Sequence, residues 1–143
     1  MLGAGDADAT THRAAELRDH LVMLLAGRAA EAHAFADDFS SGASDDLRRA
    51  AALATTMVKD LGMSRRGAAA AVGDSDETVR DELTRAEARA RDLARDHDGV
   101  LRAAAEALMA HETLDAAGLE AVFGAVARRA ASSAAATAAP SSR

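Results

Sequence analysis

The positions of large apolar residues along this chain predict a series of α-helices. In residues 11–34 these side chains share one helical face, namely Leu17, Leu21, Leu24 and Leu25. Spacings of three and four residues place side chains on one side of an α-helix, and Thr11 is the expected N-cap. A second helix is predicted from Ser44 to Leu61, because its apolar residues have the same spacing and Gly62 can cap its C-terminus.

A third helix is predicted after a connection that spans residues 63–73. Asp74 begins a capping sequence, and the apolar residues that follow form a narrow seam: Val79, Leu83, Ala86, Ala90 and Leu93. Opposite charges lie one turn apart on the outer face, pairing Asp76 with Arg80, Asp81 with Arg85 and Glu87 with Arg91. Arg65 and Arg66 in the connection are expected to be solvated.

Two shorter helical patterns complete the chain. One covers residues 100–111, and the other starts at Asp115, with Leu114 and Leu119 spaced as a hydrophobic staple. Alanine makes up 41 of the 143 residues, Ile and Tyr are absent, and aromatic residues are 2%. Alanine has the highest helix propensity, whereas strands favour β-branched and aromatic residues. The sequence therefore predicts an all-α bundle of four to five helices, with a core that has few large side chains.

The length suits one folded domain, predicted over residues 10–129. Residues 1–9 lack periodicity, and residues 130–143 form a low-complexity stretch rich in Ala and Ser, so both ends are expected to be disordered.

Charge and composition exclude several classes of partner and cofactor. The net charge is −6, which argues against nucleic acid as a partner. No apolar run approaches the ~20 residues that cross a bilayer, and no secretory signal pattern is visible, so a cytoplasmic location without a membrane segment is expected. The absence of cysteine leaves His, Asp and Glu as metal ligands. No phosphate-binding loop of the GxxxxGK[ST] type occurs, so no ATP site is expected.

Asp45 and Asp46, at the start of the second helix, are the main candidates for chemistry. A carboxylate in the first helical turn stabilises the helix by capping or through its dipole, but it can also bind a metal. The sequence contains five histidines: His12, His20, His33, His97 and His111. They are more typical of hydrogen-bonded or core-boundary positions than of metal ligands. His111-Glu112 begins a His-Glu-x-x-His motif, but Asp115 replaces the second histidine. The residues alone leave both roles of the aspartate pair open.

Three segments together resemble the C-terminal half of the peptidase domain of the FtsH family, the membrane-anchored ATP-dependent zinc metalloproteases. They are LLAGRAAE at 24–31, SGASDDLRRAAALATTMV at 41–58 and LGMS at 61–64. HETLDAAGLEAV at 111–122 also resembles that family's terminal helix. The resemblance implies that Asp46 is the third zinc ligand, because it falls on the last residue of the family's Gly-Ala-x-Asn-Asp motif, and Asp45 stands where Asn is usual.

The resemblance also implies an incomplete site. The family's zinc histidines and catalytic glutamate lie in an upstream His-Glu-x-x-His helix, and this sequence contains neither that helix nor the ATPase module. In the family site Asp46 would hold zinc, whose bound water becomes the nucleophile with the upstream glutamate as base. We therefore expect a truncated or degenerate metallopeptidase-like chain that binds zinc weakly and is inactive alone. The alternative is a non-enzymatic helical interaction or scaffold module, which forms a homo-oligomer or binds a protein partner through Ala-rich helix faces.

Overall fold

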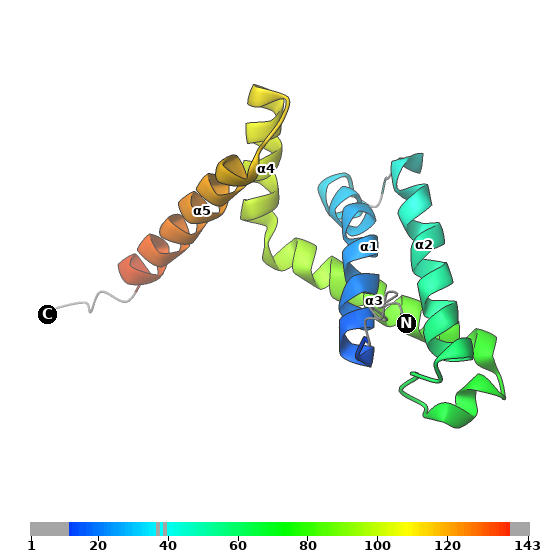
Figure 1. Cartoon of the computed structure of the whole chain (residues 1–143). Helices are drawn as coiled ribbons and strands as arrows, with labels where there is room; N and C mark the ends of the chain where they lie inside the picture. The colour runs from blue at the N-terminus through cyan, green and yellow to red at the C-terminus, as the bar shows by residue number, and fades with distance from the viewer. Residues whose placement is uncertain (1–11, 37, 39, 138–143) are drawn as a thin grey trace, which may run out of the picture. The chain divides into compact units, whose positions relative to one another are not determined.

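The computed structural model describes residues 12–36, 38 and 40–137. Within these ranges there are five α-helices and no strand, and the helices are α1 Ala14–Ala34, α2 Ser44–Thr55, α3 Ser75–Asp96, α4 Asp98–His111 and α5 Ala116–Thr137 (Figure 1). Three short helical segments join them: η1 Ser41–Ala43, η2 Thr56–Asp60 and η3 Ala68–Ala71. The predicted all-α class and the predicted number of helices are confirmed.

The chain divides into two compact units, residues 1–93 and 94–143, where the sequence predicts one domain over residues 10–129. Helix α5 continues to Thr137, so residues 130–137 are helical, although they were expected in a disordered tail. Their high alanine content favours this continuation of the helix. The predictions for residues 1–9 and 138–143 lie outside the described residues. The predicted Thr11 cap is wrong: α1 begins at Ala14 after the N-cap residue Arg13, whose N–H donates to the Glu16 carboxylate at 2.9 Å.

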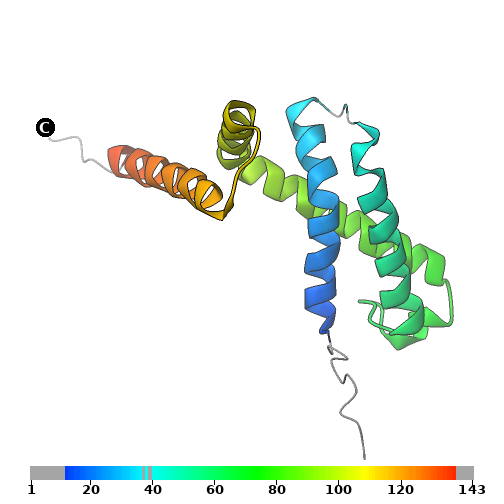
Figure 2. The same cartoon turned by 45° about the horizontal axis from the view of Figure 1, so that its top comes forward.

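In the first unit, α1 and α2 lie side by side and α3 crosses them (Figures 1 and 2). The core combines the predicted leucines of α1 with alanines of α1, α2 and α3 and with Met57 of η2. Its members are Leu17, Leu21, Leu24, Leu25, Ala29, Ala50, Ala54, Met57, Ala86 and Ala90. Leu21 and Met57 are the largest side chains in it that are fully buried. Because α2 and α3 contribute mostly alanine to this core, these few large side chains supply most of the apolar burial.

The second helix ends close to the predicted position. A π-helical turn, η2, extends α2 to Asp60, and Gly62 then adopts the left-handed backbone with φ +61°. The Met63 N–H donates to the Met57 carbonyl at 2.8 Å, one residue further back than in a Schellman motif, because the preceding turn is π-helical. Since only glycine adopts this φ without strain, the predicted capping role of Gly62 is confirmed.

The start of the third helix is also as predicted, because the Asp74 carboxylate accepts a hydrogen bond from the Glu77 N–H at 3.1 Å. Two of the predicted outer ion pairs are present, Asp81–Arg85 at 3.1 Å and Glu87–Arg91 at 3.3 Å. The predicted partner of Asp76 is wrong. Asp76 binds Lys59 of η2 at 2.7 Å instead of Arg80, because the chain folds back and brings η2 beside the start of α3.

Lys59 controls the ionisation of Asp76. Its ammonium group donates a hydrogen bond to that carboxylate and adds a positive charge, and both effects lower the pKa of Asp76. A folded pKa below the unfolded one stabilises the fold at neutral pH, and this contribution is lost as the pH falls through the lowered pKa. Lys59→Gln is therefore expected to raise the pKa of Asp76 towards its ordinary value in an NMR titration. Arg80→Gln is the control, and most of the lowering of the Asp76 pKa should remain in it. An unchanged pKa of Asp76 in Lys59→Gln would contradict this assignment.

In the second unit, α4 and α5 pack against each other. Asp115 caps α5, because its carboxylate accepts a hydrogen bond from the Gly118 N–H at 2.8 Å. Helix α4 has no buried residue, and several large apolar side chains of this unit are exposed: Leu108, Met109, Leu119 and Phe123. Among the described residues, no helix has the length and hydropathy needed to cross a membrane.

Candidate functional site

Asp45 and Asp46 lie in the first turn of α2, as predicted. The residue before this helix is Ala43, and no side-chain capping bond is present at that end of α2. Both aspartates instead pair with arginines one turn further on, Asp45 with Arg48 and Asp46 with Arg49. Their negative charge still favours the helix, because the exposed N–H groups of the first turn carry partial positive charge.

The Asp46 carboxylate is accessible and only weakly engaged. Its side chain is 50% exposed, and its oxygen lies 3.5 Å from the Arg49 guanidinium, which is 69% exposed. Surface ion pairs of this kind contribute about 0–1 kcal/mol, because water screens both charges. Arg49 therefore does not prevent Asp46 from binding another cation.

A hydrogen-bonded loop fixes the approach to α2. The Glu31 carboxylate on α1 accepts hydrogen bonds from the backbone N–H of Ser40 at 2.9 Å and from its hydroxyl at 3.1 Å. The Ser40 hydroxyl oxygen in turn accepts a hydrogen bond from the Gly42 N–H at 3.2 Å. We call this set the Glu31–Ser40–Gly42 latch. It ties the end of α1 to η1, which leads directly into the turn that carries Asp46.

The described residues do not assemble a metal site around Asp46. They include no cluster of three or more His, Asp or Glu side chains placed to hold a metal ion. His12, His20, His33, His97 and His111 are all exposed, and the structure gathers none of them into such a cluster with Asp46. Zinc in proteins is almost always bound by three or four protein ligands. The donor set around Asp46 therefore does not fit zinc by itself.

The half-motif at His111-Glu112 has a structural role. Glu112 ends α4 with a left-handed backbone of φ +61°, and its N–H donates to the Leu108 carbonyl at 2.8 Å. Asp115, which stands where the motif would need a second histidine, is occupied as the cap of α5. These residues form the junction between two helices.

A comparison with protein families accounts for the segment that contains Asp46. Residues 3–79, more than half of the chain, match the model of peptidase family M41. The chain belongs to peptidase family M41. The match covers α1, α2 and the start of α3, together with the Glu31–Ser40–Gly42 latch. The resemblance seen at 111–122 lies outside the matched range and stays a prediction.

Curated relatives match shorter parts of the chain. An ATP-dependent zinc metalloprotease FtsH of Burkholderia pseudomallei is 48% identical over 64 residues, which is 45% of this chain and 10% of that protein. FtsH 3 of Petrotoga mobilis is 44% identical over 63 residues, or 43% of this chain and 10% of the relative. FtsH 2 of Sorangium cellulosum is 52% identical over 50 residues, or 35% of this chain and 8% of the relative. The matched segments thus span about a tenth of the relatives' length.

The structure also contains a buried ionic cluster that the sequence pattern does not reveal. Glu82 on α3 is only 2% exposed and binds Arg18 of α1 and Arg65 of the connection. The expectation that Arg65 is solvated is therefore wrong in part: its side chain is half exposed, yet it faces a buried carboxylate. The one available signal was that Glu82 lies three residues after Val79 and four before Ala86, on the face of the apolar seam.

Proposed function

We propose that this chain forms the helical part of a zinc-dependent M41 peptidase domain and that Asp46 is the carboxylate ligand of its zinc. The observation that carries the proposal is the position of Asp46, which is accessible, lies in the first turn of α2 and falls within the matched residues 3–79. The relatives' names describe zinc metalloproteases, which supports a proteolytic role for the assembly that contains this segment.

The local structure suits such a ligand. Metal-binding carboxylates are held in place by neighbouring hydrogen bonds, and the Glu31–Ser40–Gly42 latch restrains the loop that precedes α2. A rigid helix start keeps the Asp46 carboxylate in one region of space, and its half-exposed position leaves it open to an incoming site. The weak pair with Arg49 costs little to break.

The remaining ligands are proposed to come from outside the described residues. One carboxylate cannot complete a zinc site, so imidazoles must be supplied by another segment or chain. When zinc is bound, it supplies a water molecule that is acidic enough to act as a nucleophile near neutral pH. The described residues by themselves are proposed to be inactive.

A chimera tests this function. The segment of the Burkholderia pseudomallei relative that corresponds to residues 3–79 is replaced by residues 3–79 of this chain, which include Asp45 and Asp46. Cleavage of an unfolded protein substrate by the chimera would support the proposal, because the rest of the relative supplies everything outside the matched segment. A folded, assembled chimera without cleavage would contradict it and would favour the alternative of a helical interaction module.

A further inference from the structure

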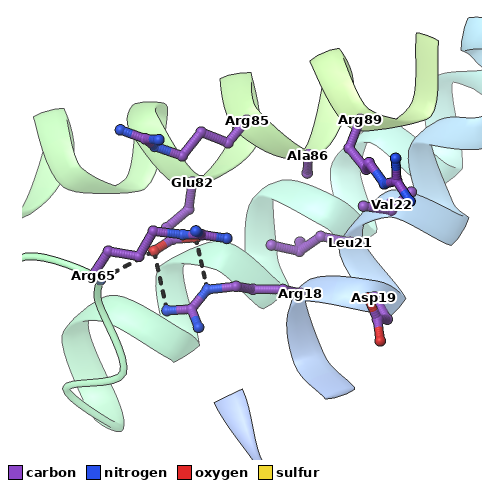
Figure 3. A pocket seen from close by; sticks show the side chains of 9 residues that line it. All are labelled: Arg18, Asp19, Leu21, Val22, Arg65, Glu82, Arg85, Ala86 and Arg89. Carbon is purple, nitrogen blue, oxygen red and sulfur yellow. Dashed lines mark hydrogen bonds and ion pairs between the residues drawn. The ribbon is translucent and has the colours of Figure 1, made fainter. Parts of the chain in front are cut away.

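Four arginines surround a hollow between α1 and α3 in the first unit. The hollow has a volume of about 270 Å³, and Arg18, Arg65, Arg85 and Arg89 line it together with Asp19 and Glu82. Leu21, Val22 and Ala86 form its apolar part (Figure 3). We call this hollow the arginine groove. It lies apart from Asp46 in sequence and in the elements that build it.

Glu82 anchors one end of the arginine groove. Its carboxylate accepts hydrogen bonds from Arg18 Nε at 3.2 Å and from the backbone N–H of Arg65 at 3.3 Å. Arg18 Nη2 also donates to the Met63 carbonyl at 3.0 Å, and Arg65 Nε lies 3.7 Å from the same carboxylate. Figure 3 shows both guanidinium groups directed at Glu82. One buried carboxylate therefore faces two cations.

The groove carries excess positive charge. Its lining contains four arginines and two acids, which gives a formal charge of +2. Asp81, next to the groove, pairs with Arg85 at 3.1 Å and reduces the excess to +1. Among the described residues, none pairs with Arg89. A cationic hollow in a chain with a net charge of −6 is a local departure from the overall charge.

Two of these arginines also repel each other. Arg85 and Arg89 are four residues apart on α3, so they are neighbours on one helical face, and like charges at this spacing are destabilising. Elsewhere on α3 the same spacing joins opposite charges, as in Glu87–Arg91. An anion placed between Arg89 and the other arginines would relieve the repulsion and supply Arg89 with a partner.

We propose that the arginine groove binds a small oxyanion, with Arg89 as its main contact. A guanidinium group presents a planar fork of N–H donors that matches the oxygens of phosphate or carboxylate groups. The groove is large enough for one such group, and Arg85 and Arg89 on its rim are exposed, so an anion can reach them from solvent. Glu82 keeps Arg18 and Arg65 in position without neutralising the whole site.

The test is a titration of the full chain with inorganic phosphate at constant ionic strength, followed by NMR of arginine Nε–H and backbone amide signals. The expected result is a saturable shift of the Arg89 Nε–H signal and of amides at Val22 and Ala86. Arg89→Gln should weaken binding by about 10- to 100-fold, the effect of losing a charge-assisted hydrogen bond.

Arg91→Gln is the matched control, because it removes the same charge from α3 two residues away and outside the groove lining. It should leave the phosphate affinity unchanged. Sulfate and acetate, titrated in parallel, distinguish recognition of a dianion from recognition of any oxyanion. NMR shifts that never saturate with phosphate would overturn the proposal, and so would an equal loss of phosphate affinity in Arg89→Gln and Arg91→Gln. Either result indicates charge screening without a binding site.

Discussion

Asp46→Asn is expected to abolish cleavage by the chimera. Asparagine keeps the shape of the side chain but loses the charge that zinc needs from its carboxylate ligand. Changes to residues that only support a metal ligand cost roughly 10- to 100-fold in metal affinity or activity, so the loss of a direct ligand should cost about 100-fold or more. The measurement is the initial rate of substrate cleavage at equal protein concentration.

Asp45→Asn is the matched control for this experiment. It removes the same charge from the same helical turn and breaks the pair with Arg48, but leaves Asp46 intact. Its rate should stay within a few-fold of the unmodified chimera. An equal loss of cleavage rate in the two variants would show that the negative charge at the start of α2 matters and that Asp46 has no special role.

Leu21→Ala is expected to destabilise the first unit by about 3 to 4 kcal/mol. Leu21 is fully buried at the contact of α1 with the other core helices. Its neighbours on α2 and α3 are largely alanine, and such small side chains cannot move far enough to fill the cavity that truncation leaves. Because few large apolar residues form this core, the loss is a large part of the unit's stability.

Hydrogen exchange of the Leu24 and Leu25 amides in α1 measures this loss. Met23→Ala is the control, since Met23 lies two residues away on the same helix and is 64% exposed. Its effect should be within about 0.5 kcal/mol, as is usual for surface substitutions. A similar change in both variants would mean that Leu21 does not pack in the core as described.

Local sequence signals predicted the fold well wherever nearby residues determine the structure. The helix start at Asp74 and the end at Gly62 depend on side chains and backbone angles within a few residues, and both were predicted. The continuation of α5 to Thr137 was missed, because a low-complexity stretch of alanine and serine resembles a disordered tail while retaining high helix propensity.

Long-range contacts were not predictable in the same way. The Lys59–Asp76 pair spans 17 positions and the Arg18–Glu82 pair spans 64, so no spacing rule relates the partners. Asp46 could be placed at a helix start from its neighbours, but the latch from Glu31 to Ser40 depends on how α1 and α2 pack. The sequence thus indicated the candidate ligand, whereas the groove and the latch required the fold.

The zinc content of the chimera tests the central claim most directly. After exhaustive dialysis against buffer with a weak chelator, metal analysis should find about one zinc per chain in the chimera and in its Asp45→Asn form, and far less in Asp46→Asn. Circular dichroism would confirm that all three are folded. Full zinc in folded Asp46→Asn would show that Asp46 is not a ligand and would contradict the proposed function.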